Sequence, residues 1–409
     1  MPPADVTSLI LWDDARARSF EPFALTRPVG ELRAGMELLR ARWERVAGAA
    51  AAGFVGAPHL GDFEEPGAPA AVAGELPAGT IVANARCAVA LDARLGDRAA
   101  VWRCEGRVAA VRLARPVPAT ALPDDDDDAL LAAAGLTAAS PCQSLAGRWI
   151  DEVWHLLRDL AAQLADDIAV VGPRLRCALP DGITVLGAHP IYVEAGAVVE
   201  PLVVMDATAG PLLVRRGATI AAFTRLVGPL FVDEGSSVGG KVANCSIGPV
   251  CRVHGEMSTV VFVGHANKAH DGFVGHSIVG RWVNVGAGTI TSNLKNTYGT
   301  VALWTPTGTR DTGMQFLGAL FGDHVKTGIG VRLTTGTVLG AGANVYGSAM
   351  PPKVVPPFAW GDGVPYANYD LARFVQTVER MMARRQMVLG ARGRHLLEAA
   401  HAARWTAAE

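Results

Sequence analysis

The sequence has few aromatic residues and almost no net charge, and each shortage excludes a class of protein. Aromatic side chains make up 6% of the 409 residues although half of the chain is hydrophobic. Much of the apolar content is therefore Ala and Val, which suits thin regular layers. The formal net charge of -2 argues against a nucleic-acid partner. No run of 18 or more apolar residues occurs, so no membrane span is expected.

The cysteines lack the spacing of a disulfide framework or a metal site. None of the six belongs to a CxxC pair, and the apolar run near the first residue is too short for a secretion signal. The sequence therefore predicts reduced thiols and a cytoplasmic protein. The cysteines are Cys87, Cys104, Cys142, Cys177, Cys245 and Cys251.

The first part of the chain alternates between strand and helix patterns. "TSLILWDD" reads as a buried strand that ends in acids, and "GTIVANARCAVAL" as a second one. Between them, residues 27–50 carry apolar side chains at helical spacing, with Pro28 suited to the first helical turn. This order predicts an α/β domain. We expect "PDDDDDALLAAAG" to be a solvated loop, and residues 144–171 to be a long helix that bridges two domains.

From about residue 170, aliphatic or small residues recur at every sixth position. An α-helix cannot keep one face inward at this period. A triangular parallel β-helix can, because three hexads complete one coil and each inward residue stacks on its copy in the next coil. The series are Val193, Val199 and Met205; Val214, Ile220, Leu226, Val232 and Val238; Ile247 and Val253; Val279, Val285 and Thr291; Phe321, Thr327, Leu333, Leu339 and Val345.

The pattern divides the chain into three parts. We expect an α/β domain over residues 1–165, a β-helix over 166–360, and a helical tail over 361–409 that caps the open end of the β-helix or packs on a neighbouring chain. Residues 301–320 leave the repeat and are expected to reach a neighbouring subunit or cover a cleft. A flat coil face makes a shallow site, so we also expect a homotrimer with clefts between subunits.

Two motifs of the repeat region resemble a known family. "NKAHDGFVGHSIVGRWV" and "NVGAGTITSNLKNTYG" look like the acetyltransferase half of the bifunctional glucosamine-1-phosphate acetyltransferase / N-acetylglucosamine-1-phosphate uridyltransferase family. "LILWDDARARSFEPFALTRPVGELRAGMELLRARWE" is similar to a divergent branch of it. The resemblance implies a nucleotidyltransferase-like α/β domain followed by a left-handed parallel β-helix, small-molecule substrates, and acetyl-CoA, UTP and Mg²⁺.

The resemblance also assigns roles to residues of the β-helix. His270, which precedes "FVG", matches the general base, and Arg252 in "SIGPVCR" matches an arginine that binds the substrate phosphate. Asn284 and Asn293 match asparagines that contact the amino sugar. The residues expected to contact acetyl-CoA are Gly286, Ala287, Gly288 and Ala341.

The chain departs from the family pattern at several substrate-binding positions. Phe273 and Leu294 stand where the family has tyrosines. The lysine on the phosphate side has no clear counterpart, and Lys268 and Lys295 are the candidates. These differences affect the identity of the sugar more than the reaction.

Acetyl transfer to an amine needs few chemical groups. The attacking amine must lose a proton, and histidine is suited to accept it because its ordinary pKa of about 6.5 is near the working pH. The oxyanion that develops on the thioester carbonyl needs a donor, which a main-chain N–H in the Gly-Ala-Gly corner can supply. Arg252 and Lys268 or Lys295 then hold the sugar phosphate.

Residues 264–277 also allow a metal hypothesis. "GHANKAHDGFVGHS" contains three histidines, and His265 and His270 with His254 could bind zinc across a subunit boundary, as in gamma-class carbonic anhydrases. The adjoining "NVGAGTITSN" favours the sugar acetyltransferase, so no metal ligand is assigned. A third hypothesis is a nucleotidyltransferase whose β-helix only assembles trimers.

The α/β domain lacks the glycine-rich loop that usually binds nucleotide phosphates, because no glycine precedes Gly30. Arg16, Arg18 and Arg27 could neutralise phosphates instead. The metal-binding aspartate of the family corresponds to Asn84, a weaker Mg²⁺ ligand since it carries no charge. The sequence leaves open whether this domain is active or serves structure and regulation.

Overall fold

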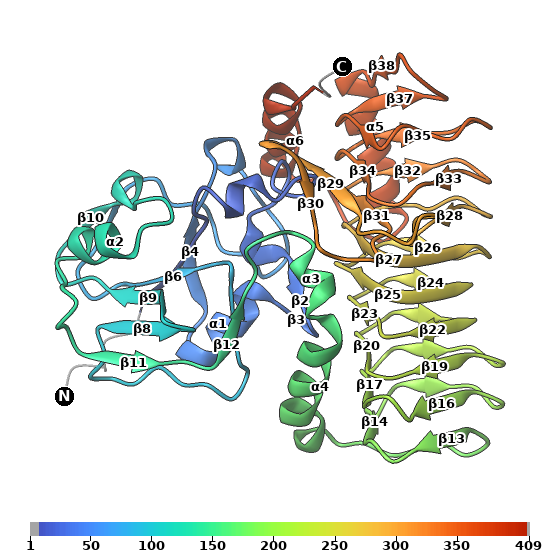
Figure 1. Ribbon diagram of the computed structural model, residues 1–409, viewed down its shortest axis with the longest axis horizontal. Coiled ribbons are helices and arrows are strands. Elements are labelled where there is room, and N and C mark those ends of the chain that lie inside the picture. The colour runs from blue at the N-terminus through green and yellow to red at the C-terminus, as the bar shows by residue number, and fades with distance from the viewer. Residues whose placement is uncertain (1–7, 407–409) are drawn as a thin grey trace. The chain divides into compact units, whose positions relative to one another are not determined.

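The computed structural model describes residues 8–406, which form two compact units (Figure 1). Unit 1 takes in the chain up to Val153, apart from Glu21–Phe23, together with Gly390–Ala402. Unit 2 takes in Trp154–Leu389. The boundary expected at residue 165 lies inside a helix of unit 2, and only Gly390–Ala402 of the expected tail belongs to unit 1.

Unit 1 is built on one mixed six-stranded sheet with the order β11-β8-β9-β6-β1-β4. The predicted strand at "TSLILWDD" is confirmed as β1, which pairs in parallel with β4 and β6. β9 runs antiparallel to both β6 and β8. The strands are β1 (Leu9–Trp12), β4 (Ala51–Val55), β6 (Ile81–Asn84), β8 (Val101–Cys104), β9 (Arg107–Arg112) and β11 (Cys142–Ser144).

Short elements complete unit 1. Two helices accompany the sheet, α1 (Leu39–Ala47) and α2 (Asp127–Ala133), and α6 (Ala391–Ala403) clusters almost wholly with this unit. The predicted second strand is divided into β6 and β7 (Cys87–Val89). The two-stranded pairs are β2 (Arg33–Ala34) with β3 (Glu37–Leu38), β5 (Glu75–Leu76) with β10 (Val117–Pro118), and β7 with β12 (Gly147–Trp149).

Three predictions about unit 1 and its border are wrong in part. The helix expected from Pro28 starts only at Leu39, because the chain first turns back at Gly35, whose φ of 59° belongs to the left-handed region. The run of five aspartates is not only a loop, since Asp126 caps α2 by accepting from the Ala129 N–H at 2.9 Å. The long bridging helix is instead β12 followed by α3 (His155–Arg158) and α4 (Leu160–Val171).

Unit 2 is a parallel β-solenoid of about ten turns, which confirms the predicted β-helix (Figure 1). Its strands form three faces. The first contains β13 (Thr184–Gly187), β16 (Val204–Ala207), β19 (Arg225–Val227), β22 (Lys241–Ala243), and the first halves of β25 (Glu256–Phe262) and β27 (Phe273–Val279). Further along this face, β28 (Ile290–Thr291) pairs with β33 (Arg332–Leu333).

The second and third faces follow the same order along the chain. The second contains β14 (Ile191–Val193), β17 (Leu212–Val214), β20 (Leu230–Val232), β23 (Ser246–Ile247), the second halves of β25 and β27, β31 (Ala319–Phe321), β34 (Thr337–Leu339) and β36 (Val354–Val355). The third contains β15 (Val198–Val199), β18 (Thr219–Ile220), β21 (Ser237–Val238), β24 (Arg252–Val253), β26 (Asn267–Lys268), β32 (Lys326–Thr327), β35 (Asn344–Val345) and β37 (Ala359–Gly361), which ends against β38 (Ala367–Asn368).

The hexad residues point into the solenoid, as their period predicted. Val193 pairs with Val214, and Val214 with Val232, so one inward column runs through successive coils. Val214 and Val232 are fully buried. Each coil therefore adds apolar contacts to the coils next to it, which is the usual source of stability in a solenoid.

Three further elements accompany the coils of unit 2. α5 (Leu371–Ala383) lies beside the last coils, where the Phe374 ring packs edge-on against Phe358 with ring centroids 5.0 Å apart (Figure 1). The segment expected to leave the repeat contains the hairpin β29 (Ala302–Thr305) and β30 (Gly308–Asp311). Among residues 8–406, every helix is too short or too polar to cross a membrane.

Candidate functional site

A cavity of about 740 Å³ lies between the third face of the solenoid and α5. His270, Asn284 and Ala287 line it, and so do Arg252 and Gly286. The structure thus brings together five of the residues that the sequence motifs singled out. They come from three successive coils, and α5 covers them with Thr377, Arg380 and Met381.

The floor of the cavity is a ladder of polar side chains on consecutive strands. Arg252 pairs with Asn267, Asn267 with Asn284, and Asn284 with Lys326. The Asn267 Nδ2 donates to the Asn284 Oδ1 at 3.4 Å, and the Asn267 Oδ1 accepts from the Arg385 Nη2 at 2.6 Å. The ladder therefore ties Arg385, in the turn after α5, to the coil that carries Asn284.

The Gly-Ala-Gly corner offers one main-chain donor to the cavity. The Gly286 N–H donates to the Thr327 Oγ1 at 3.0 Å, and the Gly288 N–H to the Asp271 carbonyl at 2.9 Å. Within the described part of the chain, the Ala287 N–H has no acceptor. Because Gly286 and Ala287 line the cavity, this amide is placed to donate to a bound oxygen atom.

Positive charge dominates the lining of the cavity. Arg252, Lys326, Arg380, Arg384 and Arg385 surround it, and its lining contains no carboxylate. None of the five forms an ion pair with another residue between 8 and 406. Burial, and then the charge of Arg252, lower the pKa of Arg385. Cations crowded together without counter-charges create a strong preference for an anionic ligand.

Lys326 is the most enclosed of these cations. Its Nζ donates to the His324 carbonyl at 3.3 Å and contacts the Met381 Sδ at 3.4 Å. Burial lowers its pKa to about 8. The sequence motifs did not single out Lys326, Asn267 or the arginines of α5 and the turn after it. The signal for the arginines was the basic pair Arg380 and Arg384, which are four residues apart and so share one helix face.

The three histidines of residues 264–277 lie in different surroundings. The His265 Nδ1 is 2.9 Å from the Arg281 Nη2, and its ring packs on Trp282. The His276 Nδ1 is 2.9 Å from the Asn293 Nδ2, and burial lowers the pKa of His276 to about 4. The imidazole of His270 is exposed and has no hydrogen-bond partner among the described residues.

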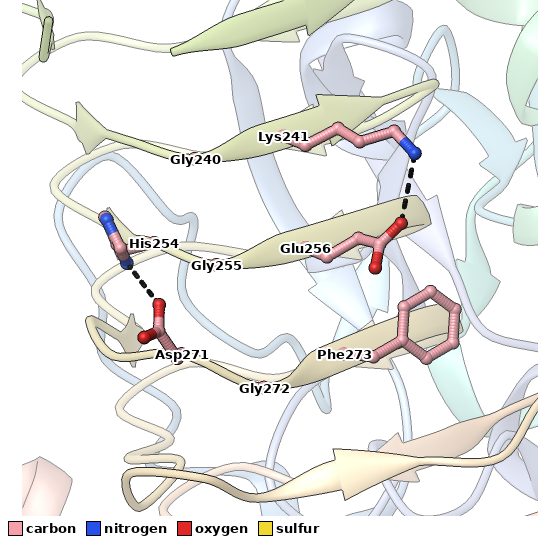
Figure 2. Close-up of a pocket in the computed structure, with 8 residues that line it drawn as sticks. All are labelled: Gly240, Lys241, His254, Gly255, Glu256, Asp271, Gly272 and Phe273. Carbon is pink, nitrogen blue, oxygen red and sulfur yellow. Dashed lines mark hydrogen bonds and ion pairs between the residues drawn. The ribbon is translucent and has the colours of Figure 1, made fainter. Parts of the chain in front are cut away.

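A separate hollow lies at the corner between the third and first faces (Figure 2). Figure 2 shows His254 facing Asp271 and Lys241 facing Glu256, with the Phe273 ring on the next coil. The His254 Nδ1 is 3.4 Å from the Asp271 Oδ1, and the Lys241 Nζ is 3.1 Å from the Glu256 Oε1. Phe273 therefore belongs to this hollow and not to the cavity that contains His270.

The other residues singled out in unit 2 lie outside the cavity. Asn293 contacts His276 at another corner, and the Lys295 Nζ donates to the Thr300 carbonyl at 3.0 Å. Ala341 is fully buried, and its carbonyl accepts from the Phe358 N–H at 2.8 Å. Lys268 is also fully buried, with its Nζ directed at main-chain carbonyls.

The zinc hypothesis finds no complete ligand set in one chain. Between residues 8 and 406, no three His, Cys, Asp or Glu side chains are grouped closely enough to hold a metal ion. His254 pairs with Asp271, and His265 contacts Arg281.

In unit 1, the arginines expected to bind nucleotide phosphates are engaged with carboxylates. Arg18 pairs with Asp124 at 2.8 Å, and Arg27 with Glu65 at 2.9 Å. Arg16 lies 3.2 Å from a carboxylate oxygen of Asp125.

Arg86, which the sequence analysis overlooked, lies at the centre of a buried charge network. Its guanidinium contacts both carboxylate oxygens of Asp14, and its Nη1 lies 2.8 Å from the Asp151 Oδ1. Arg86 and Asp14 are both fully buried. The Asn84 Nδ2 donates to the Asp14 Oδ2 at 2.8 Å. The network joins the ends of β1 and β6 to the segment that follows β12.

These groups do not fit a Mg²⁺ site. Mg²⁺ is bound through carboxylate oxygens with octahedral geometry. Here Asp14 already accepts from Arg86 and Asn84, and the arginine supplies the positive charge that a cation would bring. Hydrogen bonds and the charge of Arg86 hold the pKa of Asp14 below its usual range, although burial opposes them.

The chain is similar to known transferases. Residues 9–173 match the family model described as "Sugar nucleotidyl transferase". Two curated relatives from Desulfitobacterium hafniense, strains DSM 10664 / DCB-2 and Y51, are each named "Bifunctional protein GlmU". Each is 29% identical to this chain over 196 residues, which is 41% of this chain and 40% of the relative.

A third relative, from Sulfurisphaera tokodaii, is named "Bifunctional sugar-1-phosphate nucleotidylyltransferase/acetyltransferase". It is 34% identical over 95 residues, which is 23% of this chain and 24% of the relative. The chain thus spans less than half the length of the curated relatives that it matches.

Proposed function

We propose that unit 2 transfers an acetyl group from acetyl-CoA to the amine of an amino-sugar phosphate. The proposal starts from a chain whose first domain matches sugar nucleotidyl transferases and whose motifs and solenoid fit a divergent GlmU-like family. The amino sugar resembles glucosamine-1-phosphate. The carrying observation is that the candidate base, the candidate oxyanion donor and a cationic lining without carboxylates share one cavity.

In this reaction the sugar nitrogen forms a bond to the acetyl carbon, and the bond from that carbon to the CoA sulfur breaks. The His270 imidazole accepts the proton that the amine loses and returns it to the leaving thiolate. The Ala287 N–H donates to the oxyanion of the tetrahedral intermediate. Asn284 orients the sugar, and Arg252 holds its phosphate. The products are the N-acetylated sugar phosphate and CoA thiol.

The test is the release of CoA thiol from acetyl-CoA in the presence of glucosamine-1-phosphate. We expect His270→Ala to lower kcat by 100-fold or more, because general base catalysis contributes about 10²–10⁴-fold. His189→Ala changes an exposed histidine of the first coils and serves as the matched control. Normal turnover by His270→Ala would eliminate this assignment.

A second candidate activity is nucleotidyl transfer by unit 1, which the family match favours. A sugar-1-phosphate oxygen would attack the α-phosphorus of UTP and release pyrophosphate. The assay mixes UTP with N-acetylglucosamine-1-phosphate, with and without Mg²⁺, and measures pyrophosphate. Pyrophosphate release without any acetyl-CoA turnover would favour a solenoid that only assembles chains.

We also propose that three chains assemble around the solenoid. Phe273 and Asn293, which the family resemblance places near the substrate, lie at corners away from the His270 cavity. A neighbouring chain in a threefold trimer could present these corners to that cavity. Light scattering should then give a mass of about three times 42.7 kDa. A monomer at assay concentration would contradict the assembly.

A further inference from the structure

The corner that carries His270 is wider than the two corners beneath it. Only Gly239 and Gly240 separate the third-face strand β21 from β22, and only His254 and Gly255 separate β24 from β25. In the next coil, residues 269–272 separate β26 from β27. The main chain therefore makes a longer turn at the corner of His270, and Asp271 and Gly272 of this corner line the hollow of Figure 2.

Lys268 stands at the base of the wide corner in an otherwise apolar inward column. It pairs with Val253, which pairs with Val238, and both valines are buried. Val285 continues the column in the following coil. Lys268 is 0% exposed, so its ammonium cannot reach solvent or a bound sugar phosphate. Placing an ammonium in such a column costs free energy unless hydrogen bonds compensate it.

Two main-chain carbonyls accept hydrogen bonds from this ammonium. The Lys268 Nζ donates to the His254 carbonyl at 3.3 Å and to the His270 carbonyl. The His254 carbonyl belongs to the narrow corner and the His270 carbonyl to the wide one, so the Lys268 side chain connects the two corners. Burial lowers the pKa of Lys268 to about 8, and the charge of the Asp271 carboxylate offsets only part of this effect.

The groups around this bridge are closely packed. A Cβ added to Gly255 would lie 3.0 Å from the Gly272 carbonyl oxygen, 3.1 Å from the His270 carbonyl oxygen and 3.3 Å from the Lys268 Nζ. Gly255 and Gly272 also have φ values of 106° and 128°, which side chains rarely adopt. The wide corner thus has little freedom to rearrange while the lysine is in place.

We infer that Lys268 is a positioning residue that fixes the main chain of the His270 corner and thereby the place of the imidazole. The side chain of His270 has no hydrogen-bond partner among residues 8–406, so its position depends on its own main chain. The consequence for catalysis rests on the proposed acetyl transfer. The effect of Lys268 on the main chain is independent of that proposal.

The experiment compares Lys268→Met with Lys353→Met in the full-length protein. Methionine keeps an unbranched side chain of similar length and removes the donor. Lys353 is an exposed lysine of the same solenoid that lines neither the cavity nor the hollow of Figure 2, so this control should change little. Amide hydrogen exchange of the peptides that cover residues 269–273 is followed by mass spectrometry.

We expect exchange at residues 269–273 to be at least tenfold faster in Lys268→Met, with unchanged exchange over residues 204–227. Unchanged exchange at 269–273 would overturn the inference, whatever the enzyme does. In the acetyl-transfer assay, Lys268→Met should lower kcat by tenfold or more and change KM by less than threefold. Wild-type protein without acetyl transfer would refute the proposed function and leave the exchange result to decide on Lys268.

A measurement on the wild type covers the case in which Lys268→Met does not fold. Acetic anhydride labelling of the native protein, read by mass spectrometry, should modify Lys268 at least tenfold more slowly than Lys353. Equal rates would show that the Lys268 amine is open to solvent and would overturn the inference.

Discussion

The environment of His276 differs from that of His270, although the two side chains are six residues apart. Burial lowers the pKa of His276 from the ordinary histidine value of 6.5 to about 4. His276 is therefore neutral throughout the range in which a catalytic histidine changes its charge. In an NMR titration, we expect its imidazole signal to have a midpoint near pH 4, and a midpoint above 6 would contradict the burial that the structure shows.

Lys268 should make the stability of the protein depend on alkaline pH. Its folded pKa of about 8 is lower than the value near 10.4 of an unfolded lysine, so the unfolded state binds more protons between these values. The free energy of unfolding therefore rises with pH in this window. Relative to Lys268→Met, we expect wild-type protein to gain roughly 2 kcal/mol between pH 7 and pH 9.5. Urea unfolding at both pH values measures the difference, and parallel pH profiles of the two proteins would contradict it.

The inward position of Lys268 could have been predicted from the sequence. It lies six residues after Phe262 and six before Val274, so the hexad frame places it in the core. Lys268 is nevertheless a candidate phosphate ligand from its sequence alone, because charged residues seldom occupy a core. The bridge between two corner carbonyls could not have been predicted, since it depends on the change in corner width.

At the scale of elements, α5 and the turn that follows it add Arg380, Arg384 and Arg385 to the cations of the third face. Arg384→Gln with Arg385→Gln should raise KM for a phosphorylated amino sugar about 100-fold or more, because two charge-assisted hydrogen bonds contribute about 1.5–3 kcal/mol each. The effect on kcat should be small. Arg373→Gln, which changes an exposed arginine of α5 outside the cavity, is the control. Equal KM values for the double variant and the control would refute the anion-binding role of α5.

The elements that the sequence predicted well are those with a strict period. Inward columns such as Val214 and Val232 follow from counting by six, since each coil repeats the same contacts. The segment after Pro28 has helical spacing, but Gly35 favours a hairpin, and the buried Arg42 donates from its Nε and Nη2 to the Ala34 carbonyl there. Tertiary hydrogen bonds therefore replaced the helix. The place of α5 could not be predicted either, because the pattern of its residues does not indicate on which surface the helix packs.

At the scale of the whole molecule, the two units depend on different interactions. Unit 1 contains a buried ion pair at its centre, whereas unit 2 is stabilised by apolar columns. Removing Arg86 leaves Asp14 as an unpaired buried charge, which costs about 3–5 kcal/mol. We expect Arg86→Met to lower the unfolding midpoint of unit 1 in urea and to leave acetyl transfer by unit 2 largely intact.

Arg98→Met changes an exposed arginine of unit 1 and provides the control for this measurement. Tryptophan fluorescence follows the transition, because Trp43 and Trp102 are buried in unit 1. An unfolding midpoint equal to that of the control would show that the Arg86 network does not stabilise the unit.

The polar ladder from Arg252 to Lys326 has a consequence for which ligands the cavity can select. Its four side chains stand on adjacent strands, which are about 4.8 Å apart. Three such steps amount to roughly 14 Å. A ligand that carries anionic groups at both ends can contact Arg252 and Lys326 together only if its length matches this span. The spacing of the coils therefore sets the length of the ligand that the cavity accepts. Shortening or lengthening the ladder by one coil would change this length by one strand spacing.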